Sequence, residues 1–134
     1  MLTELTIKDF ISKVISNDPV PGGGSVSALN GALAAALSAM VANLTVGRKK
    51  YVEVNDLMQE LSTRFEKLSQ KLIEDVDRDS DAYNRVFAAF KLPKETDEEK
   101  QVRSEAIQRE TKYAAQVPME VARAVYEVLP QIDA

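Results

Sequence analysis

Hydrophobic residues recur along most of the chain at intervals of three and four residues, the spacing of one face of an α-helix. The first such segment covers residues 6–17, with apolar positions at Ile7, Phe10, Ile11, Val14 and Ile15. A second stripe runs from about residue 53 to residue 90, and a third begins near residue 97. No stretch alternates between apolar and polar residues as a half-buried strand does. The pattern predicts an all-α protein, an orthogonal or up-down helical bundle with one long helix, folded as a single domain over residues 1–134.

The boundaries of these helices are marked by residues that stop or cap a helix. Residues 18–24 hold two prolines and three glycines, which no regular element accommodates, and Ser25 follows as an N-cap or first-turn residue. Gly47, followed by three basic residues, predicts the end of the next helix. Thr96 and Glu99 have the spacing of a capping box, and Pro118 lies where a proline should kink the last helix.

Residues 25–46 are nearly all small or apolar, so this segment admits a membrane interpretation. Six polar residues interrupt it, however, and alanine and glycine outnumber leucine, isoleucine and phenylalanine, the strongly apolar residues of a spanning helix. Thin helix faces let neighbouring backbones approach closely. We therefore expect a small-residue helix buried in the bundle or at a subunit contact, and no membrane span.

Composition excludes several kinds of chemistry. The 17 basic and 21 acidic side chains give a formal net charge of −4, which argues against non-specific binding of nucleic acid. The absence of cysteine and histidine removes thiol nucleophiles, thiolate metal sites and the commonest general base. Acid–base chemistry must then use carboxylates, lysine, tyrosine or water. No basic segment precedes an apolar one at the start, so we expect a cytoplasmic protein.

The glycine-rich loop is the first candidate for a binding site. A helix N-terminus carries free backbone N–H groups and a partial positive charge, and glycines let a ligand approach that backbone. The segment suits a carboxylate or a phosphate. A plain interhelix turn is the alternative, although three consecutive glycines are more than a turn needs. The candidate binding residues here are Pro21, Gly22, Gly23, Gly24 and Ser25.

The second candidate is a carboxylate in an acidic run of the long helix. Most of residues 74–81 fit a solvated helix face, but Asp79 falls on the apolar stripe with Tyr83 one turn later. A carboxylate on the core side is costly unless it is paired or used. Asp79 therefore either pairs with an arginine or caps a neighbouring helix, or it lines a cleft and transfers protons. Asp75 lies one turn earlier, where two carboxylates could share a proton or hold a cationic substrate.

Polar groups near the end of the small-residue helix form a third candidate. Arg48 and Lys49 either compensate the helix dipole or contact the anionic tail of a substrate. Asn30 and Asn43 lie in an otherwise apolar helix, and a buried asparagine needs a hydrogen-bonding partner in the backbone, a second subunit or a ligand.

Taken in this order, these segments resemble the formiminotetrahydrofolate cyclodeaminase family, which includes methenyltetrahydrofolate cyclohydrolases and the C-terminal domain of formiminotransferase-cyclodeaminase. The matching segments are residues 19–28, 40–43, 45–49, 77–83, 89–94 and 115–118. The resemblance implies an all-helical homodimer with a folate site near the subunit contact. It further implies a small-molecule folate substrate, with no metal and no cofactor besides the tetrahydrofolate derivative itself.

The resemblance also implies a reaction at the bridge between N5 and N10 of tetrahydrofolate. A cyclodeaminase closes formimino-tetrahydrofolate to methenyl-tetrahydrofolate and releases ammonia, whereas a cyclohydrolase hydrolyses the methenyl bridge. Asp79 is the natural proton carrier for either reaction, with Asp77 as the second catalytic candidate, and Asn43, Arg48, Lys49 and Tyr83 complete the candidate binding set. Because the family's domain continues past the segments matched here, a non-catalytic folate-binding or dimerisation module is the alternative from another class.

Overall fold

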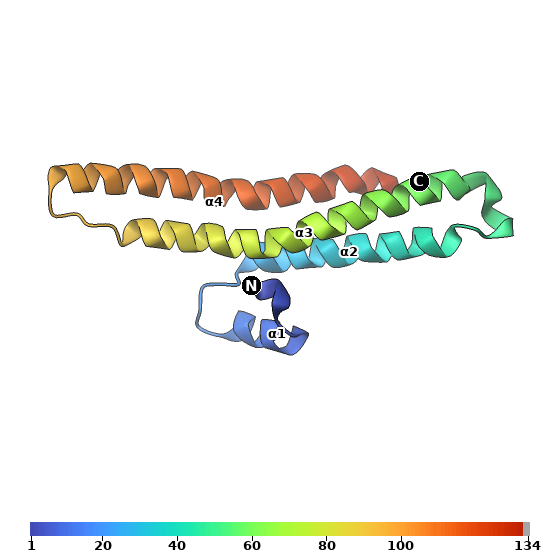
Figure 1. Cartoon of the computed structure of the whole chain (residues 1–134), viewed down its shortest axis with the longest axis horizontal. Helices are drawn as coiled ribbons and strands as arrows, with labels where there is room; N and C mark the ends of the chain where they lie inside the picture. The colour runs from blue at the N-terminus through green and yellow to red at the C-terminus, as the bar shows by residue number, and fades with distance from the viewer. Residues whose placement is uncertain (133–134) are drawn as a thin grey trace.

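The computed structural model describes residues 1–132 and is all-helical over that range, which confirms the predicted fold class. The elements are η1 (Leu2–Glu4), α1 (Ile7–Ile15), α2 (Gly23–Thr45), η2 (Lys49–Val54), α3 (Asn55–Phe90) and α4 (Asp97–Ile132). Helices α2, α3 and α4 are long and run alongside one another with up-down connections, while α1 lies against one side of them (Figure 1).

The helix ends follow the capping residues of the sequence. The Thr6 hydroxyl accepts the backbone N–H of Asp9 and caps α1. The predicted capping box is formed, because Glu99 N–H donates to Thr96 Oγ1 and Thr96 N–H donates to a Glu99 carboxylate oxygen, both at 3.1 Å. Gly22 is the N-cap of α2, so Ser25 occupies the first turn. A 3₁₀ segment, η2, precedes α3 and was not predicted.

Helix α2 is buried along one face only. Its alanines at i, i+4, i+7, i+11 and i+14 pack against α3 and are at most 5 % exposed: Ala28, Ala32, Ala35, Ala39 and Ala42. The opposite face carries large apolar side chains that are 49–59 % exposed: Leu33, Leu37, Met40, Val41 and Leu44. The predicted burial of this helix therefore holds for its thin face. Within residues 1–132 α2 is also the one helix long and apolar enough to cross a membrane, a test that core helices of soluble proteins pass too.

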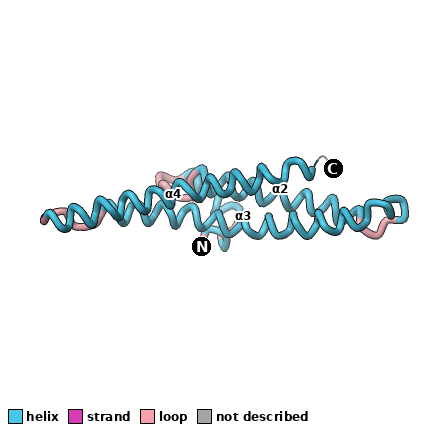
Figure 2. The backbone as a smooth tube through the Cα atoms, turned by 90° about the horizontal axis from the view of Figure 1, so that it is seen from above, coloured by secondary structure: helices cyan, strands magenta, loops and turns pink. Residues whose placement is uncertain are grey.

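The stripe of α3 is covered along only part of its length. Leu61, Phe65, Leu72 and Val76 are buried against α2 and contribute to two core clusters. Helices α3 and α4 extend past the point where α2 begins and form a two-helix arm there (Figures 1 and 2). We define this arm as residues 83–112. Tyr83, Phe87 and Phe90 continue the stripe there and are 42–52 % exposed.

Helix α4 continues through Pro118 without interruption from Asp97 to Ile132. Proline has no backbone N–H, so the carbonyl oxygen of Ala114, one turn earlier, lacks the hydrogen bond that residue 118 would otherwise donate. The side chain of Val117 next to this proline is fully buried. The proline therefore modifies the hydrogen bonding of α4 without ending it.

Candidate functional site

The glycine-rich loop is attached to α3 through Ser25, whose side chain is fully buried. The Ser25 hydroxyl lies 2.7 Å from the carbonyl oxygen of Val76, 2.9 Å from the hydroxyl of Ser80 and 3.3 Å from Oδ2 of Asp79. One short side chain thus fixes the first turn of α2 to one turn of α3.

Gly24 allows the Asp79 carboxylate to lie directly against the start of α2. A Cβ atom at residue 24 would stand 2.1 Å from Oδ1 and 2.4 Å from Cγ of Asp79, far inside van der Waals contact. Any larger residue at position 24 would therefore force the Asp79 carboxylate away from the position it occupies here. A carboxylate is favoured beside a helix N-terminus, because the backbone dipoles there present partial positive charge. Within the described chain Asp79 forms no ion pair with lysine or arginine, and its one hydrogen bond there is accepted from the Ser25 hydroxyl, with none from a backbone N–H of α2.

A cleft of about 590 Å³ opens beside Gly24, between α2 and α4. The residues that line it are Gly23, Gly24, Ser27 and Gly31 on α2, with Pro118, Val121, Ala122, Val125, Tyr126 and Leu129 on α4. A Cβ atom at residue 31 would lie 3.1 Å from Leu72 and 3.2 Å from Val125, so the helices nearly touch at that point. The walls are mostly apolar and carry no charged side chain, and the carboxylate of Asp79 lies next to one end, behind Gly24.

The other carboxylates of the acidic run serve different contacts. Asp77 accepts the backbone N–H of Leu2 and the hydroxyl of Thr3, and so holds η1 against α3. Its catalytic role beside Asp79 remains a prediction that this placement does not favour, because residues two apart on a helix point to opposite sides. Asp75 is 1 % exposed and pairs with Arg78 at 3.1 Å. A cation therefore occupies the position where we considered proton sharing between Asp75 and Asp79.

Arg78 extends this ion pair to α4, because its guanidinium also bonds Glu120. The hydrogen bond that Arg78 donates to Glu120 raises the pKa of Arg78, although burial of the guanidinium opposes that change. The hydrogen bond from Arg78 in turn lowers the pKa of Glu120. The network stays charged near neutral pH and holds α3 to α4 beside the buried Val76.

Three candidate binding residues lie at the other end of α2. Asn43 is exposed rather than buried, so the need for a buried partner does not arise. It accepts the hydroxyl of Ser62 at 2.6 Å and donates to Glu66 at 3.3 Å. Arg48 donates to the carbonyl of Leu44 at the helix end, and Lys49 opens η2. At 1.5 Å per residue, the length of α2 separates this end from Gly23 by about 33 Å. In a single chain these residues cannot contact a small ligand held at Asp79.

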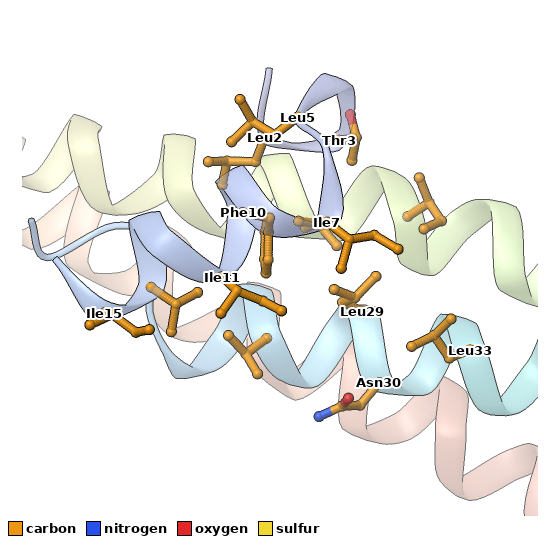
Figure 3. Close-up of a pocket in the computed structure, with 14 residues that line it drawn as sticks. Leu2, Thr3, Leu5, Ile7, Phe10, Ile11, Ile15, Leu29, Asn30 and Leu33 are labelled. Atoms are coloured by element: carbon orange, nitrogen blue, oxygen red, sulfur yellow. The ribbon is translucent and has the colours of Figure 1, made fainter.

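Asn30 and Tyr83, the other two polar candidates, lie in two different parts of the molecule. Asn30 lies at the edge of an apolar hollow of about 500 Å³ between α1 and α2, whose walls include Ile7, Phe10 and Leu33 (Figure 3). Tyr83 lies one turn beyond Asp79 on the arm and is 42 % exposed. Among residues 1–132 no three acidic side chains converge to form a metal site.

Sequence reasoning missed the α4 wall of the cleft and the hydroxyl of Ser80. The apolar residues of α4 follow ordinary core spacing, so their periodicity does not distinguish a cleft from a helix contact. The sequence held one signal for this wall, which is Pro118. A proline in the middle of a helix is unfavourable by roughly 3 kcal/mol, so its presence there suggests a specific role at that position.

Comparison with known proteins identifies the family. Residues 6–134 match the family model described as formiminotransferase-cyclodeaminase. The chain is 42 % identical to the methenyltetrahydrofolate cyclohydrolase of Methylorubrum extorquens over 92 % of its own length and 60 % of that protein. It is 35 % identical to the formimidoyltransferase-cyclodeaminase of Rattus norvegicus over 98 % of its own length and 24 % of that protein.

The fold is similar as well. The crystal structure of the formiminotetrahydrofolate cyclodeaminase of Thermotoga maritima superposes with a TM-score of 0.77 at 34 % identity, over 92 % of this chain and 58 % of that one. The chain thus spans about three fifths of these two bacterial relatives. With the family model matched over nearly its whole length, the chain belongs to the formiminotransferase-cyclodeaminase family.

Proposed function

We propose that this chain acts on the one-carbon bridge between N5 and N10 of tetrahydrofolate, and that it closes formimino-tetrahydrofolate to methenyl-tetrahydrofolate with release of ammonia. The observation that carries the proposal is the placement of Asp79, whose carboxylate lies against Gly24, one of the residues that line the cleft between α2 and α4. The name of the Thermotoga maritima relative supports the same reaction.

The chemistry needs a group that accepts one proton and donates it again. N10 attacks the carbon of the protonated formimino group, and a tetrahedral carbon forms between N5, N10 and the former imino nitrogen. The proton of N10 passes to the imino nitrogen, the bond from that nitrogen to carbon breaks, and ammonia leaves the methenyl cation. Asp79 is assigned the transfer of this proton, since the sequence offers no histidine and a carboxylate carries protons in such steps.

Hydrolysis of the methenyl bridge is the second candidate, and the 42 % identity to a cyclohydrolase favours it. Here a water molecule adds to the methenyl carbon and loses one proton to Asp79. The remaining hydroxyl proton passes to N5 as the bond from carbon to N5 breaks, which gives the 10-formyl compound and releases one proton overall. Both reactions pass through a tetrahedral carbon between the same two nitrogens, so one placement of Asp79 serves either.

A folate-binding or dimerisation module without turnover is the third candidate, from another class of function. One absorbance experiment separates the three. Growth of the methenyl band from formimino-tetrahydrofolate identifies a deaminase, and loss of the band from methenyl-tetrahydrofolate above the spontaneous rate identifies a hydrolase. No change with either substrate contradicts both enzymatic proposals, and thermal protection by 5-formyl-tetrahydrofolate then tests for binding alone.

We also propose a homodimer formed through the exposed apolar face of α2. Five large apolar side chains lie there at 49–59 % exposure, and Ile7 and Ile15 of α1 extend the surface at 80 % and 77 % exposure. Contiguous apolar surface on a soluble protein marks an interaction site. Leu37→Glu should convert the dimer to monomer in light scattering, whereas Val102→Glu, at an equally exposed position on the arm, should not. A monomeric wild type, or a dimeric Leu37→Glu variant, contradicts this interface.

A further inference from the structure

We infer that the cleft between the glycine loop and α4 holds the bicyclic pterin part of the substrate, with Ala122 and Tyr126 as the positioning residues on α4. The identity of the ligand rests on the proposed function. The placement within the molecule rests on the cleft itself and on the chemistry of its walls.

The connectivity of the substrate restricts where its ring lies. N5, one end of the reacting bridge, is an atom of the pterin ring, so the ring must lie within a few ångströms of the carboxylate that handles the proton. Gly24 touches Asp79 and also lines the cleft. At about 590 Å³ the cleft lies in the range of small-molecule sites. The apolar hollow between α1 and α2 is not lined by Gly24.

The walls of the cleft favour a neutral flat ring over the anionic tail of a folate. Val121, Val125 and Leu129 line it, and no lysine or arginine does. A carboxylate placed there would lose water without gaining a cation, which costs several kcal/mol. It would also lie near the negative charge of Asp79. A heterocycle loses little by leaving water, provided that its amide edge finds hydrogen-bonding partners.

Backbone groups at the cleft supply both kinds of partner for such an edge. The N–H groups of Gly23 and Gly24 belong to the first turn of α2 and have no acceptor within that helix. On the opposite wall lies Pro118, and one turn before it the carbonyl oxygen of Ala114 lacks its usual donor. Donors on one side and an acceptor near the other match a ring that carries a carbonyl, a ring N–H and an exocyclic amine.

Tyr126 lies at the open edge of the cleft with 74 % of its surface exposed. An aromatic ring so exposed contributes little to the core, whereas it can stack on a flat ligand ring. Ala122, one turn earlier, leaves the space that a ring would occupy.

The experiment compares one substitution at two positions of α4. Ala122→Trp fills the cleft, while Ala115→Trp places the same ring two turns earlier, at an exposed position outside it. Calorimetry measures binding of 6-methyltetrahydropterin and of 5-formyl-tetrahydrofolate to each full-length variant. We expect Ala122→Trp to weaken both ligands by about tenfold or more, about 1.4 kcal/mol. Ala115→Trp should bind both as the wild type does. Tyr126→Ala, which removes an exposed side chain, should weaken the pterin severalfold with unchanged far-ultraviolet helicity.

The outcomes separate this inference from the proposed function. Equal pterin affinity in Ala122→Trp and wild type overturns the inference, even if the wild type turns over folate. A wild type without turnover, whose pterin affinity is lost in Ala122→Trp, supports the inference and contradicts the proposed reaction. If Ala122→Trp fails to fold, Tyr126→Ala decides alone, and wild-type affinity for the pterin in that variant overturns the assignment.

Discussion

The two ends of α2 contact α3 through similar polar side chains but offer very different chemistry. At the C-terminal end, Asn43, Ser62 and Glu66 bond one another, so that each side chain finds its partner within the group. At the N-terminal end, Ser25 binds α3 in a comparable way, yet the carboxylate of Asp79 is left beside a glycine and an open cleft. The comparison shows that a polar contact between helices becomes a candidate site when a cavity adjoins it and one charged group remains unpaired.

The largest effect should come from Asp79→Asn. The amide keeps the shape of the side chain but cannot carry the proton, so turnover should fall by about 10²–10⁴-fold while the affinity for 5-formyl-tetrahydrofolate changes little. Initial rates from methenyl absorbance and calorimetry measure the two quantities. Wild-type turnover would remove the chemical distinction between the two ends of α2 and show that Asp79 is structural.

The variants Gly24→Ala and Gly23→Ala together test the close approach of the Asp79 carboxylate to Gly24 at the N-terminal end of α2. The new Cβ atom at residue 24 collides with the whole carboxylate of Asp79, whereas at residue 23 it meets nothing within 4 Å. Gly24→Ala should therefore destabilise the fold by about 1–3 kcal/mol and reduce turnover with it. Gly23→Ala should leave the melting temperature near that of wild type. Equal melting temperatures for the two variants would contradict the packing described for Gly24.

At the other end of α2, Arg48→Ala and Lys49→Ala should change turnover less than about twofold, because roughly 33 Å separates these residues from Asp79 in one chain. Asn43→Ala should cost about 1 kcal/mol of stability through its lost hydrogen bonds. Steady-state kinetics and thermal melts check both expectations. A strong loss of turnover in Arg48→Ala would mean that this end serves the site of a second copy.

The smallest effect, a change in melting temperature, is expected in the two-helix arm of α3 and α4, which lies beyond α2. Arg109 and Arg85 hold the pKa of Glu110 below its usual range. A carboxylate with a lowered folded-state pKa stabilises the fold above its unfolded pKa of about 4.3, and this contribution is lost as the pH falls through the folded value. The Glu110→Gln variant should melt slightly below wild type near neutral pH, and the difference should vanish in acid. A constant difference across that range would show that the ion pairs contribute nothing.

Much of the fold was predictable because caps and apolar spacing act locally. Thr6 and Thr96 begin their helices as expected, and Gly47 follows α2 in the left-handed conformation. The burial of each helix was less predictable, because it depends on where a neighbour ends. The α3 stripe appears continuous in the sequence, yet it is buried as far as Val76 and exposed at Phe87, since α2 begins opposite Asp79.

The candidate site was predictable in part for the same reason. The glycines and Asp79 stood out as local anomalies, and the fold brings them together. Asp75 and Asp77 resembled Asp79 in sequence, and only their neighbours Arg78 and Leu2 distinguish them. The α4 wall depends on packing between residues about 100 apart in the chain, which no local pattern reveals.

The uneven covering of α3 gives one helix two levels of protection against hydrogen exchange. Between Leu61 and Val76 its backbone is covered by α2, so its amides should open only with the whole molecule. From Tyr83 to Phe90 the same helix has α4 as its packing partner within residues 1–132, and the arm can open while the rest stays folded. The boundary between slow and fast exchange should then fall near Asp79, where proton transfer is proposed.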